Sequence, residues 1–234
     1  MPAASPVPNV AQSVKDRIFH RAGELQFDDC RFTSANPPES AAHLQAWLAK
    51  GDHGEMHYLA RNAEKRADLQ KVLPGARTVI SLATGYHSPH TPDALRSHAP
   101  PFSGIIARYA RFNDYHKVIN ERLKELTRFI SALQPGTKSL WYVDTGPILE
   151  RDLAQRAGLG FIGKHTNLIS RRLGNWIFLS EIITTLELAP DQPEKNRCGS
   201  CSRCITACNS SRIRWNMAST TSSSRTTVST CCRS

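Results

Sequence analysis

The stretch LWYVDTGPILERDLAQRAGLG, residues 140–160, decides how the middle of this chain folds. Its first four residues are bulky, aromatic or β-branched, which favours a buried strand. The segment 144–147, Asp-Thr-Gly-Pro, then ends the strand, because glycine and proline favour turns. A helix is expected to follow and to stop at Gly158. The stretch therefore predicts a strand, a tight turn and a helix in succession.

Similar signals extend outward in both directions. A long helix capped by Asn113 and stopped by Pro135-Gly136 should place one apolar face inward. That face contains Val118, Ile119, Leu123, Leu126, Phe129, Ile130 and Leu133. Further helices are expected over 11–24, 38–51 and 55–68, further strands over 27–32, 77–84 and 176–183, and a proline-rich loop over 87–103. Alternating helices and apolar strands predict a fold of the α+β class with a mixed α/β domain.

The composition of the chain indicates its possible binding partners and its cellular compartment. The chain has 234 residues, 40% of them hydrophobic, which is enough for a real core. No stretch is apolar for long enough to span a bilayer, and the N-terminus does not resemble an export signal, so a cytoplasmic protein is expected. The formal net charge of +10 suits a polyanion such as RNA, although many basic proteins bind no nucleic acid.

Four cysteines, Cys198, Cys201, Cys204 and Cys208, form a C-x2-C-x2-C-x3-C run. This spacing is typical of bacterial-type ferredoxins and predicts an iron–sulfur site. Structural zinc is the main alternative, although it usually takes two pairs of ligands separated by a longer loop. Disulfides would need an oxidising compartment. Cys30 lies in a more apolar stretch and is interpreted as a buried thiol.

The two ends of the chain read as disordered, over residues 1–10 and 209–234. The C-terminal stretch is rich in serine and threonine, and it carries arginine but no acid. Asn209 stands where a proline commonly follows the last cysteine of such a run. The abrupt change of composition suggests a frameshift or a truncation soon after Cys208. The expected organisation is a main domain over 11–190 and a partial ferredoxin-like segment over 191–208.

Three blocks of the sequence resemble epoxyqueuosine reductases. They are GDHGEMHYLARNAEKR at 51–66, ARYARFNDYHKVINERLKEL at 107–126 and WYVDTGPILERDLAQRAGLGFIGKHTNLIS at 141–170. The order of the blocks, followed by the cysteine run, also matches that family. The resemblance covers about residues 11–208 and implies a cobalamin-dependent, iron–sulfur enzyme that reduces epoxyqueuosine to queuosine in tRNA. Such an enzyme would take electrons from an external donor, and a monomer is expected.

The resemblance also implies roles for individual residues. Asp144 matches the family's proposed proton donor, and burial at the end of a strand would keep a proton on its carboxyl group; as an alternative, it caps the next helix. The positions that match contacts to cobalamin are Arg66, Ala107, Arg108, Asp144, Lys164, His165, Leu168 and Leu179. Ordinary core leucines and solvated charges remain the alternative for several of them. Cys198, Cys201, Cys204 and Cys208 would hold a [4Fe–4S] cluster.

The chain departs from the family in one respect. The family carries a second cysteine set downstream, and this sequence lacks it, so a truncated form is expected, with at most one of the two clusters and with an activity that the loss of the second could abolish. Two other classes stay open: a ferredoxin-like electron carrier, and a related corrinoid reductase that acts on small molecules.

Overall fold

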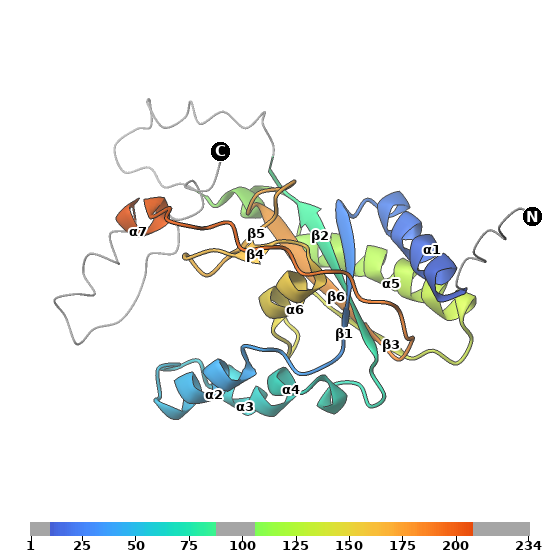
Figure 1. The fold of residues 1–234 in the computed structure, drawn as a ribbon, viewed down its shortest axis with the longest axis horizontal. Helices are drawn as coiled ribbons and strands as arrows, with labels where there is room; N and C mark the ends of the chain where they lie inside the picture. The colour runs from blue at the N-terminus through green and yellow to red at the C-terminus, as the bar shows by residue number, and fades with distance from the viewer. Residues whose placement is uncertain (1–9, 88–105, 208–234) are drawn as a thin grey trace, which may run out of the picture.

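The computed structural model describes residues 10–87 and 106–207. Its centre is an antiparallel sheet of four strands in the order β1-β2-β6-β3 (Figure 1). The strands are β1 (Asp29–Ser34), β2 (Thr78–Gly85), β6 (Ile177–Thr184) and β3 (Ser139–Tyr142). β2 and β6 pair along their whole length, from Thr78 opposite Thr184 to Gly85 opposite Ile177. Because every pairing is antiparallel, the fold is α+β, as the sequence predicted.

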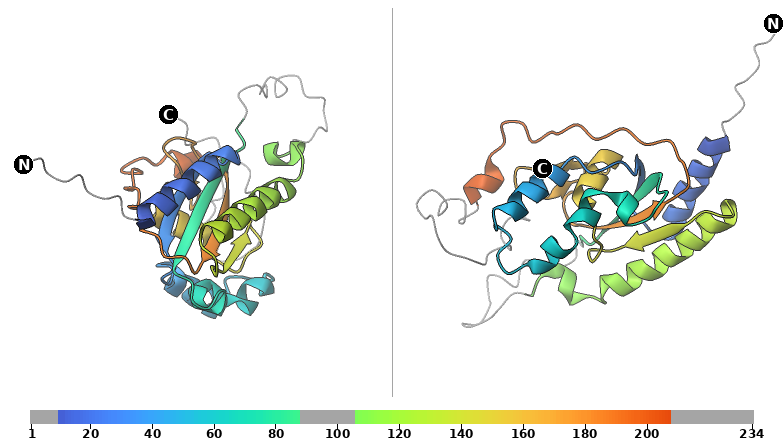
Figure 2. Two further views of the ribbon diagram at one scale, coloured as in Figure 1. Left: turned by 90° about the vertical axis from the view of Figure 1, so that its right-hand side faces the viewer. Right: turned by 90° about the horizontal axis from the view of Figure 1, so that it is seen from below.

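One face of the sheet is covered by α1 (Val10–Glu24) and α5 (Tyr115–Leu133), which lie on the same side of the sheet in the turned views of Figure 2. α5 turns its buried residues to this core, as its apolar spacing predicts. The core also takes buried side chains from the strands β1, β2 and β6. Its main members are Ile18, Phe32, Ile80, Leu82, Ile119, Leu123, Leu126, Ile130 and Ile182.

The opposite face is covered by α6 (Glu150–Ala157), whose Leu153 and Ala154 are completely buried. α6 ends at Gly158, as predicted, with a left-handed backbone at φ +87°. A Cβ atom on Gly158 would lie only 2.3 Å from the carbonyl oxygen of Gln192. Only glycine satisfies both the conformation and the close approach.

A layer of short helices lies below the sheet in Figure 1, between β1 and β2 in sequence. It consists of α2 (Ala41–Ala49), α3 (His57–Arg61), α4 (Ala63–Ala67) and the 3-10 turn η1 (Leu69–Lys71). The single helix predicted over 55–68 is therefore wrong, because the chain breaks at Asn62, whose φ of −118° and ψ of 22° are not helical. Arg156 fastens the start of this layer by donating to Thr33 and to the carbonyl oxygens of Ser34, Asn36 and Pro37.

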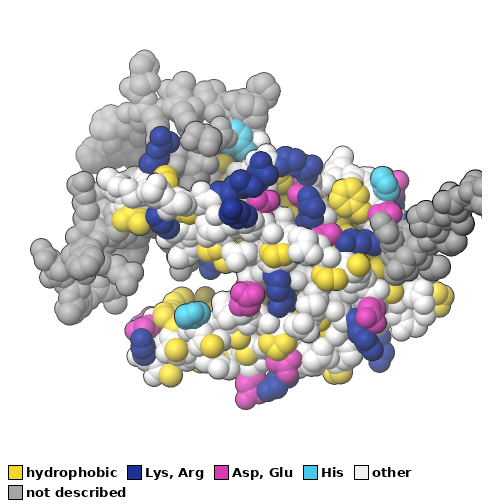
Figure 3. All heavy atoms as spheres, in the orientation of Figure 1, with side chains coloured by type: hydrophobic (Ala, Val, Ile, Leu, Met, Phe, Trp, Pro, Cys, Tyr) yellow, Lys and Arg dark blue, Asp and Glu magenta, His cyan; other side chains and the backbone are white. Residues whose placement is uncertain are grey.

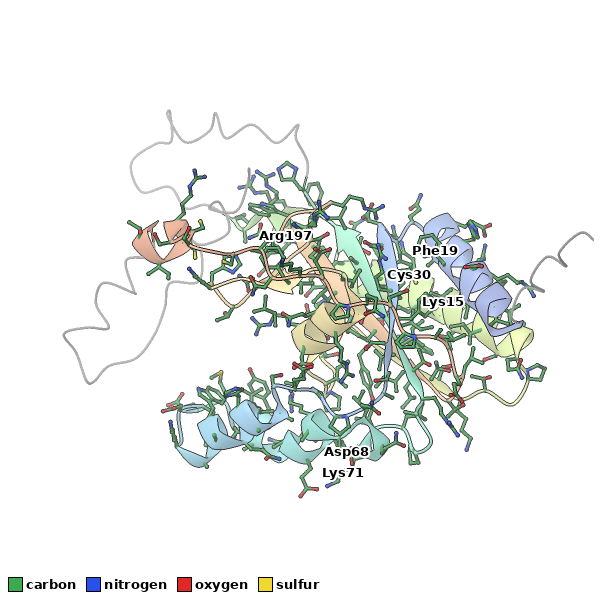
Figure 4. All side chains as sticks on the ribbon, in the orientation of Figure 1. Lys15, Phe19, Cys30, Asp68, Lys71 and Arg197 are labelled. Carbon is green, nitrogen blue, oxygen red and sulfur yellow. The ribbon has the colours of Figure 1, made fainter. Side chains whose placement is uncertain are left out.

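The segment after β6, residues 188–197, runs back along the outer edge of β1; we call it the strap. Asp191 exchanges two hydrogen bonds with the backbone of Phe32, at 2.8 and 2.9 Å. Asp191 also pairs with Lys15 of α1 at 2.6 Å. Figure 4 labels Lys15 on α1 and Cys30 on the neighbouring strand. The strap covers a sheet edge that would otherwise expose unpaired backbone groups.

Beyond the sheet lie the hairpin of β4 (Phe161–Ile162) and β5 (Leu168–Ile169), the 3-10 turn η3 (Arg108–Arg111) and α7 (Arg203–Ala207). The strap leads toward α7 past the hairpin, where Asn196 donates to the carbonyl oxygen of Ile162 at 3.2 Å. No helix within the described ranges is long and apolar enough to cross a membrane.

Several local predictions need correction. β3 is an edge strand rather than a buried one, and its Leu140 is 38% exposed. α5 is capped by Asp114, not Asn113, since the Asp114 carboxylate accepts from the backbone N–H of His116 at 3.0 Å. Val118 lies outside the buried face of α5. Most of the loop predicted over 87–103 lies outside the described residues, as do residues 1–9 and 209–234.

Candidate functional site

Asp144 lies two residues beyond the end of β3, at the tip of a strained turn. Its φ is +56°, in the left-handed region that residues with a side chain rarely adopt. The backbone N–H of Thr145 donates to the carbonyl oxygen of Val143 at 2.6 Å, so the chain reverses around Asp144 within three residues. Gly146 permits the reversal, because a Cβ atom there would meet the Tyr142 ring at 2.5 Å. Strain of this kind gathers at functional sites.

The Asp144 carboxylate accepts a hydrogen bond from the hydroxyl group of Tyr115. Burial, followed by this bond to a carboxylate, raises the pKa of Tyr115, so the phenol stays protonated and acts as the donor. The His116 Nε2 atom lies 3.9 Å from the same carboxylate. The Asp144 side chain is 47% exposed. The expectation that it would be buried is therefore wrong, and the group is open to an incoming molecule.

Tyr115 belongs to a stack of aromatic rings that fixes its position. Its ring lies 3.9 Å from that of Phe178, nearly parallel, and 4.0 Å from that of His116. Phe178 stacks in turn on Tyr86 at 4.4 Å. Stacking between aromatic rings adds about 0.5–1.5 kcal/mol per pair beyond the burial of area. The stack therefore holds the phenol in place for Asp144.

A cavity of about 790 Å³ opens beside this stack. Aromatic and basic side chains line it, among them Tyr86, Tyr109, Phe112, Tyr115, Phe178, Arg111 and Arg122. Aromatic faces suit flat rings, and guanidinium groups suit phosphates. The cavity therefore has the chemistry to hold a nucleotide next to Tyr115, the hydrogen-bond partner of Asp144.

Two further carboxyl groups lie behind Asp144, on the α6 side of the sheet. Burial, and then the charge of Asp144, raises the pKa of Glu150 to about 8, although a backbone hydrogen bond from Asp144 opposes the rise. Glu181 is completely enclosed in β6, and neither of its carboxyl oxygens has a hydrogen-bond partner. Burial, followed by the charges of Glu150 and Asp144, raises the pKa of Glu181 well above its ordinary value.

Arg66 differs from the solvated charge that its residue type suggests. Only 9% of it is exposed, and its Nη1 atom has no hydrogen-bond partner. Loss of water lowers the pKa of Arg66, while Tyr58 and Glu150 act against that shift. A buried, unsatisfied guanidinium nitrogen is costly and is the kind of group that a polar ligand would complete.

A hollow lies between the elements that carry several of the predicted cofactor contacts. Figure 3 shows this face hollowed between the layer of α2–α4 and the part that carries α6 and the β4–β5 hairpin. Arg66 belongs to α4, and Lys164 and His165 lie in the turn of the hairpin. Burial lowers the pKa of His165, which favours the neutral imidazole. These residues, with an unsatisfied nitrogen on Arg66, suit a large polar ligand such as a corrin.

The remaining predicted contacts fall into two other places. Ala107 and Arg108 begin η3, and the Arg108 guanidinium lies 5.0 Å from the centre of the Trp176 ring. Leu168 and Leu179 pack in one core cluster with Ala83, Ala154 and Leu159. Packing in the hydrophobic core accounts for the positions of both leucine side chains. A ligand could contact only the parts of them that face away from this cluster.

The cysteine run lies at the end of the strap. Cys198 is partly exposed, Cys201 exposed and Cys204 buried on α7, while Cys208 lies outside the described residues. Within residues 10–87 and 106–207, no three His, Cys, Asp or Glu side chains lie close enough to hold a metal ion. The donor chemistry of the thiols suits iron, and Lys164 fastens their loop by donating to the carbonyl oxygens of Gly199 and Cys201 at 2.9 and 3.0 Å. Cys30 is buried and free, as predicted.

Sequence reasoning missed Tyr115, Glu150 and Glu181 as members of this site. Tyr115 and Glu150 look like ordinary residues at the start of helices. Glu181 did leave a signal, since it is the one charged residue in the apolar strand sequence IFLSEIIT. A charged residue at the centre of such a strand indicates a functional site, because burying its charge without a partner costs several kcal/mol.

Comparison with known proteins identifies the class. The family model described as epoxyqueuosine reductase QueG, DUF1730, matches residues 66–145, which run from Arg66 to the turn of Asp144. An epoxyqueuosine reductase from Gloeobacter violaceus is 42% identical over 205 residues, covering 86% of this chain and 60% of that relative. The fold and the matched segment thus define a protein of the QueG class.

Solved structures agree with this class. The epoxyqueuosine reductase of Streptococcus thermophilus is 33% identical, with a TM-score of 0.75 over 85% of this chain and 53% of that one. A second epoxyqueuosine reductase, solved with an epoxyqueuosine-modified tRNA-Tyr stem loop, is 29% identical, with a TM-score of 0.73 over 85% of this chain and 52% of that one. The chain belongs to the epoxyqueuosine reductase family. It spans a little over half the length of the relatives it matches.

Proposed function

We propose that this chain takes part in the reduction of epoxyqueuosine to queuosine in tRNA, with Asp144 as the proton donor. The observation that carries the proposal is the placement of Asp144. Its carboxyl group stands half exposed on a strained turn and takes a hydrogen bond from Tyr115, which itself lines a cavity of aromatic and basic groups. A relative in the same family has been solved with the modified tRNA stem loop.

The chain's own residues supply the acid chemistry and part of the binding. Opening an epoxide leaves negative charge on oxygen, and a proton delivered there by Asp144 prevents its return to carbon. The Tyr115 hydroxyl stabilises the carboxylate that remains, because it donates to the same group. The aromatic faces of the cavity would hold a base by stacking, and its arginines would pair with phosphate.

Two cofactors belong to the proposal. Arg66, Ala107, Arg108, Asp144, Lys164, His165, Leu168 and Leu179 would contact cobalamin, and Cys198, Cys201, Cys204 and Cys208 would hold a [4Fe–4S] cluster. The corrin would supply the reductive step at carbon, and the cluster would pass electrons from an external donor. We infer that residues 11–190 form the cobalamin-binding unit and 191–208 the first part of a ferredoxin-like segment. We expect a monomer in the cytoplasm, where tRNA is found and thiols stay reduced.

The cofactors are tested first, by metal and corrin analysis of the chain purified and reconstituted without oxygen. Cobalt and a corrin absorbance that persist through gel filtration are expected, together with iron that Cys201→Ala reduces. A chain that retains no corrin, and gains no thermal stability from added cobalamin, would contradict the cobalamin assignment.

The reaction is tested with the loaded chain, a chemical reductant and an epoxyqueuosine-containing tRNA stem loop, with queuosine measured by mass spectrometry. Asp144→Asn should lower the rate at least about 100-fold, since a positioned acid contributes about that much. Asp68→Asn is the matched control, because Asp68 caps the turn η1 in the lower helix layer (Figure 4) and asparagine caps equally well. Equal rates for the two variants would refute the role of Asp144.

A further inference from the structure

The first two cysteines of the run stand at the two ends of one tight turn. The backbone N–H of Cys201 donates to the carbonyl oxygen of Cys198 at 3.1 Å, which closes a turn over residues 198–201. Gly199, the second residue of this turn, has a left-handed backbone at φ +49°, a conformation that glycine adopts without strain. The turn, which we call the cysteine turn, therefore holds the backbones of two predicted cluster ligands close together.

Two side chains fasten the cysteine turn to the β4–β5 hairpin, one at each end. Asn196 accepts from the backbone N–H of Cys198 at 2.9 Å and donates to the carbonyl oxygen of Ile162 at 3.2 Å. Lys164 donates to the carbonyl oxygens of the second and fourth residues of the turn at 2.9 and 3.0 Å. Hydrogen bonds from a charged donor are stronger than neutral ones. The turn therefore cannot move away from the hairpin without breaking bonds at both of its ends.

The turn of the hairpin has little freedom of its own. The backbone N–H of Gly163 donates to the carbonyl oxygen of Asn167 at 3.0 Å, and that of Thr166 donates to the carbonyl oxygen of Gly163 at 2.8 Å. The backbone N–H of Asn167 also donates to the Nδ1 atom of His165 at 3.1 Å. These bonds fix Lys164, which fastens the cysteine turn, next to His165, which is a predicted cofactor contact.

The hairpin is fastened in turn to α6. The side chain of Gln155 accepts from the backbone N–H of Ile162 at 2.9 Å, and the guanidinium of Arg151 donates to the carbonyl oxygen of Thr166. Both side chains belong to α6, which follows the turn of Asp144 along the chain. A continuous series of hydrogen bonds thus joins the cysteine turn, through the hairpin, to the helix that comes after Asp144.

Lys164 also places a positive charge against a segment without acids. Residues 195–208 include three Lys or Arg and no Asp or Glu. Glu194, which precedes them, pairs with Arg197 at 3.2 Å (Figure 4). A [4Fe–4S] cluster held by four thiolates is an anion, and it gains a further negative charge when it is reduced. Nearby positive charge stabilises the reduced form and thereby raises the reduction potential of the cluster.

We propose that the β4–β5 hairpin is the scaffold that fixes the cysteine turn relative to the reaction site, with Lys164 and Asn196 as the positioning residues. Lys164 thus has a role besides the predicted contact to the corrin. Two of the three N–H donors of its ammonium group bind the turn, and one is left for a ligand. When a cluster is bound, the scaffold keeps it at a constant separation from the turn of Asp144, and the charge of Lys164 raises its potential. The inference rests on the proposed function for its use, although the fastening of the turn does not.

The fastening is tested on the chain alone, by hydrogen exchange and mass spectrometry under reducing conditions. Asn196→Asp keeps the acceptor for the backbone N–H of Cys198 but loses the donor to Ile162, and Lys164→Met removes both bonds from the ammonium group. Each variant should speed exchange in the cysteine turn about fivefold or more. Lys195→Met, which changes an exposed lysine of the same segment, should not. Unchanged exchange in β2 and β6 would show that the variants fold, and unchanged exchange in the turn would overturn the proposal.

The role toward the cofactors is tested by EPR spectroscopy of the chain reconstituted with iron, sulfide and cobalamin. Lys164→Met should lower the reduction potential of the cluster, whereas Lys164→Arg, which keeps the charge, should not. Lys124→Met is the control, since Lys124 lies on α5, on the other side of the sheet. The reduced cluster and cob(II)alamin are both paramagnetic, so pulsed EPR measures their separation. Its distribution should be narrow in the wild type and broader in Asn196→Asp.

The outcomes separate this inference from the proposed function. A wild-type potential in Lys164→Met, together with a wild-type separation in Asn196→Asp, would overturn the inference but leave the proposed function standing. A wild type that assembles no cluster would refute the cluster assignment of the proposed function, and with it the use of the scaffold. Hydrogen exchange tests the fastening of the turn in either case.

Discussion

Replacement of Gly158 by alanine should destabilise the protein through two separable effects. The first is the left-handed backbone at φ +87°, which costs a residue with a Cβ atom about 1–2 kcal/mol. The second is the collision of that Cβ atom with the Gln192 carbonyl oxygen, at 2.3 Å, against backbone that cannot rotate away. Forcing a methyl group into such a contact costs about 1–3 kcal/mol. Together they predict a loss of about 2–5 kcal/mol in the free energy of unfolding.

The chain offers a matched control for the second effect. Gly136 has the same φ of +87°, and a Cβ atom there would meet nothing within 4 Å. Gly136→Ala should therefore cost only the backbone contribution, about 1–2 kcal/mol. Urea denaturation followed by tryptophan fluorescence measures both variants. Losses that agree within about 0.5 kcal/mol would refute the claim that the strap is clamped against the end of α6.

Three further predictions concern the carboxyl groups and the arginine clamp. Folding raises the pKa of Glu150 from 4.5 to about 8, so the folded state holds a proton there that the unfolded chain releases, and stability falls as pH rises between these values. Between pH 5 and pH 8 the wild-type protein should lose about 4 kcal/mol in its free energy of unfolding. Denaturation at these two pH values should show no such loss for Glu150→Gln. Tyr115→Phe should lower kcat about tenfold at unchanged KM, while denaturation midpoints show stability within about 1 kcal/mol, because the ring stack survives and only the bond to Asp144 is lost. Arg156→Lys should cost about 2 kcal/mol and speed hydrogen exchange after β1, because an ammonium group cannot reach the acceptors that the guanidinium joins, whereas the exposed Arg128→Lys should change neither.

The elements that the sequence predicted well are those with a strong local signal. The apolar spacing of residues 118–133 identified the buried face of α5, and the dense β-branched run at 77–84 identified the central strand β2. Gly158 marked the end of α6, because its backbone requirement is local. Periodicity and turn chemistry act over a few residues, so they can be read without the rest of the fold.

Predictions that depended on distant partners were wrong or missing. The run Leu-Trp-Tyr-Val at 140–143 reads as buried, but β3 lies at the edge because β6, which comes later in the chain, takes the central place. The rule that active sites follow buried parallel strands does not apply to this antiparallel sheet. Asp144 was identified through the resemblance of its motif to a family rather than through its position in the sheet.

The buried glutamates near Asp144 were beyond the reach of local reasoning for a related reason. Glu181 and Asp144 are 37 positions apart along the chain, and the pairing of β3 with β6, which sets Tyr142 opposite Glu181, brings their segments together. Arg66, from the layer below the sheet, joins them only in the folded protein. A charged residue in an apolar strand, with no partner on the same strand, indicates that residues from distant parts of the chain pack against it.

The strand order also constrains how this protein is made. β6 lies between β2 and β3, yet it is synthesised after both. While a ribosome is still producing the segment that precedes residue 177, the inner edges of β2 and β3 have no complementary strand and remain open to other chains. Sheets whose pairing waits for distant segments fold slowly and are prone to aggregate meanwhile. Chaperone capture of the nascent chain should therefore peak just before β6 emerges and end once β6 has left the ribosome.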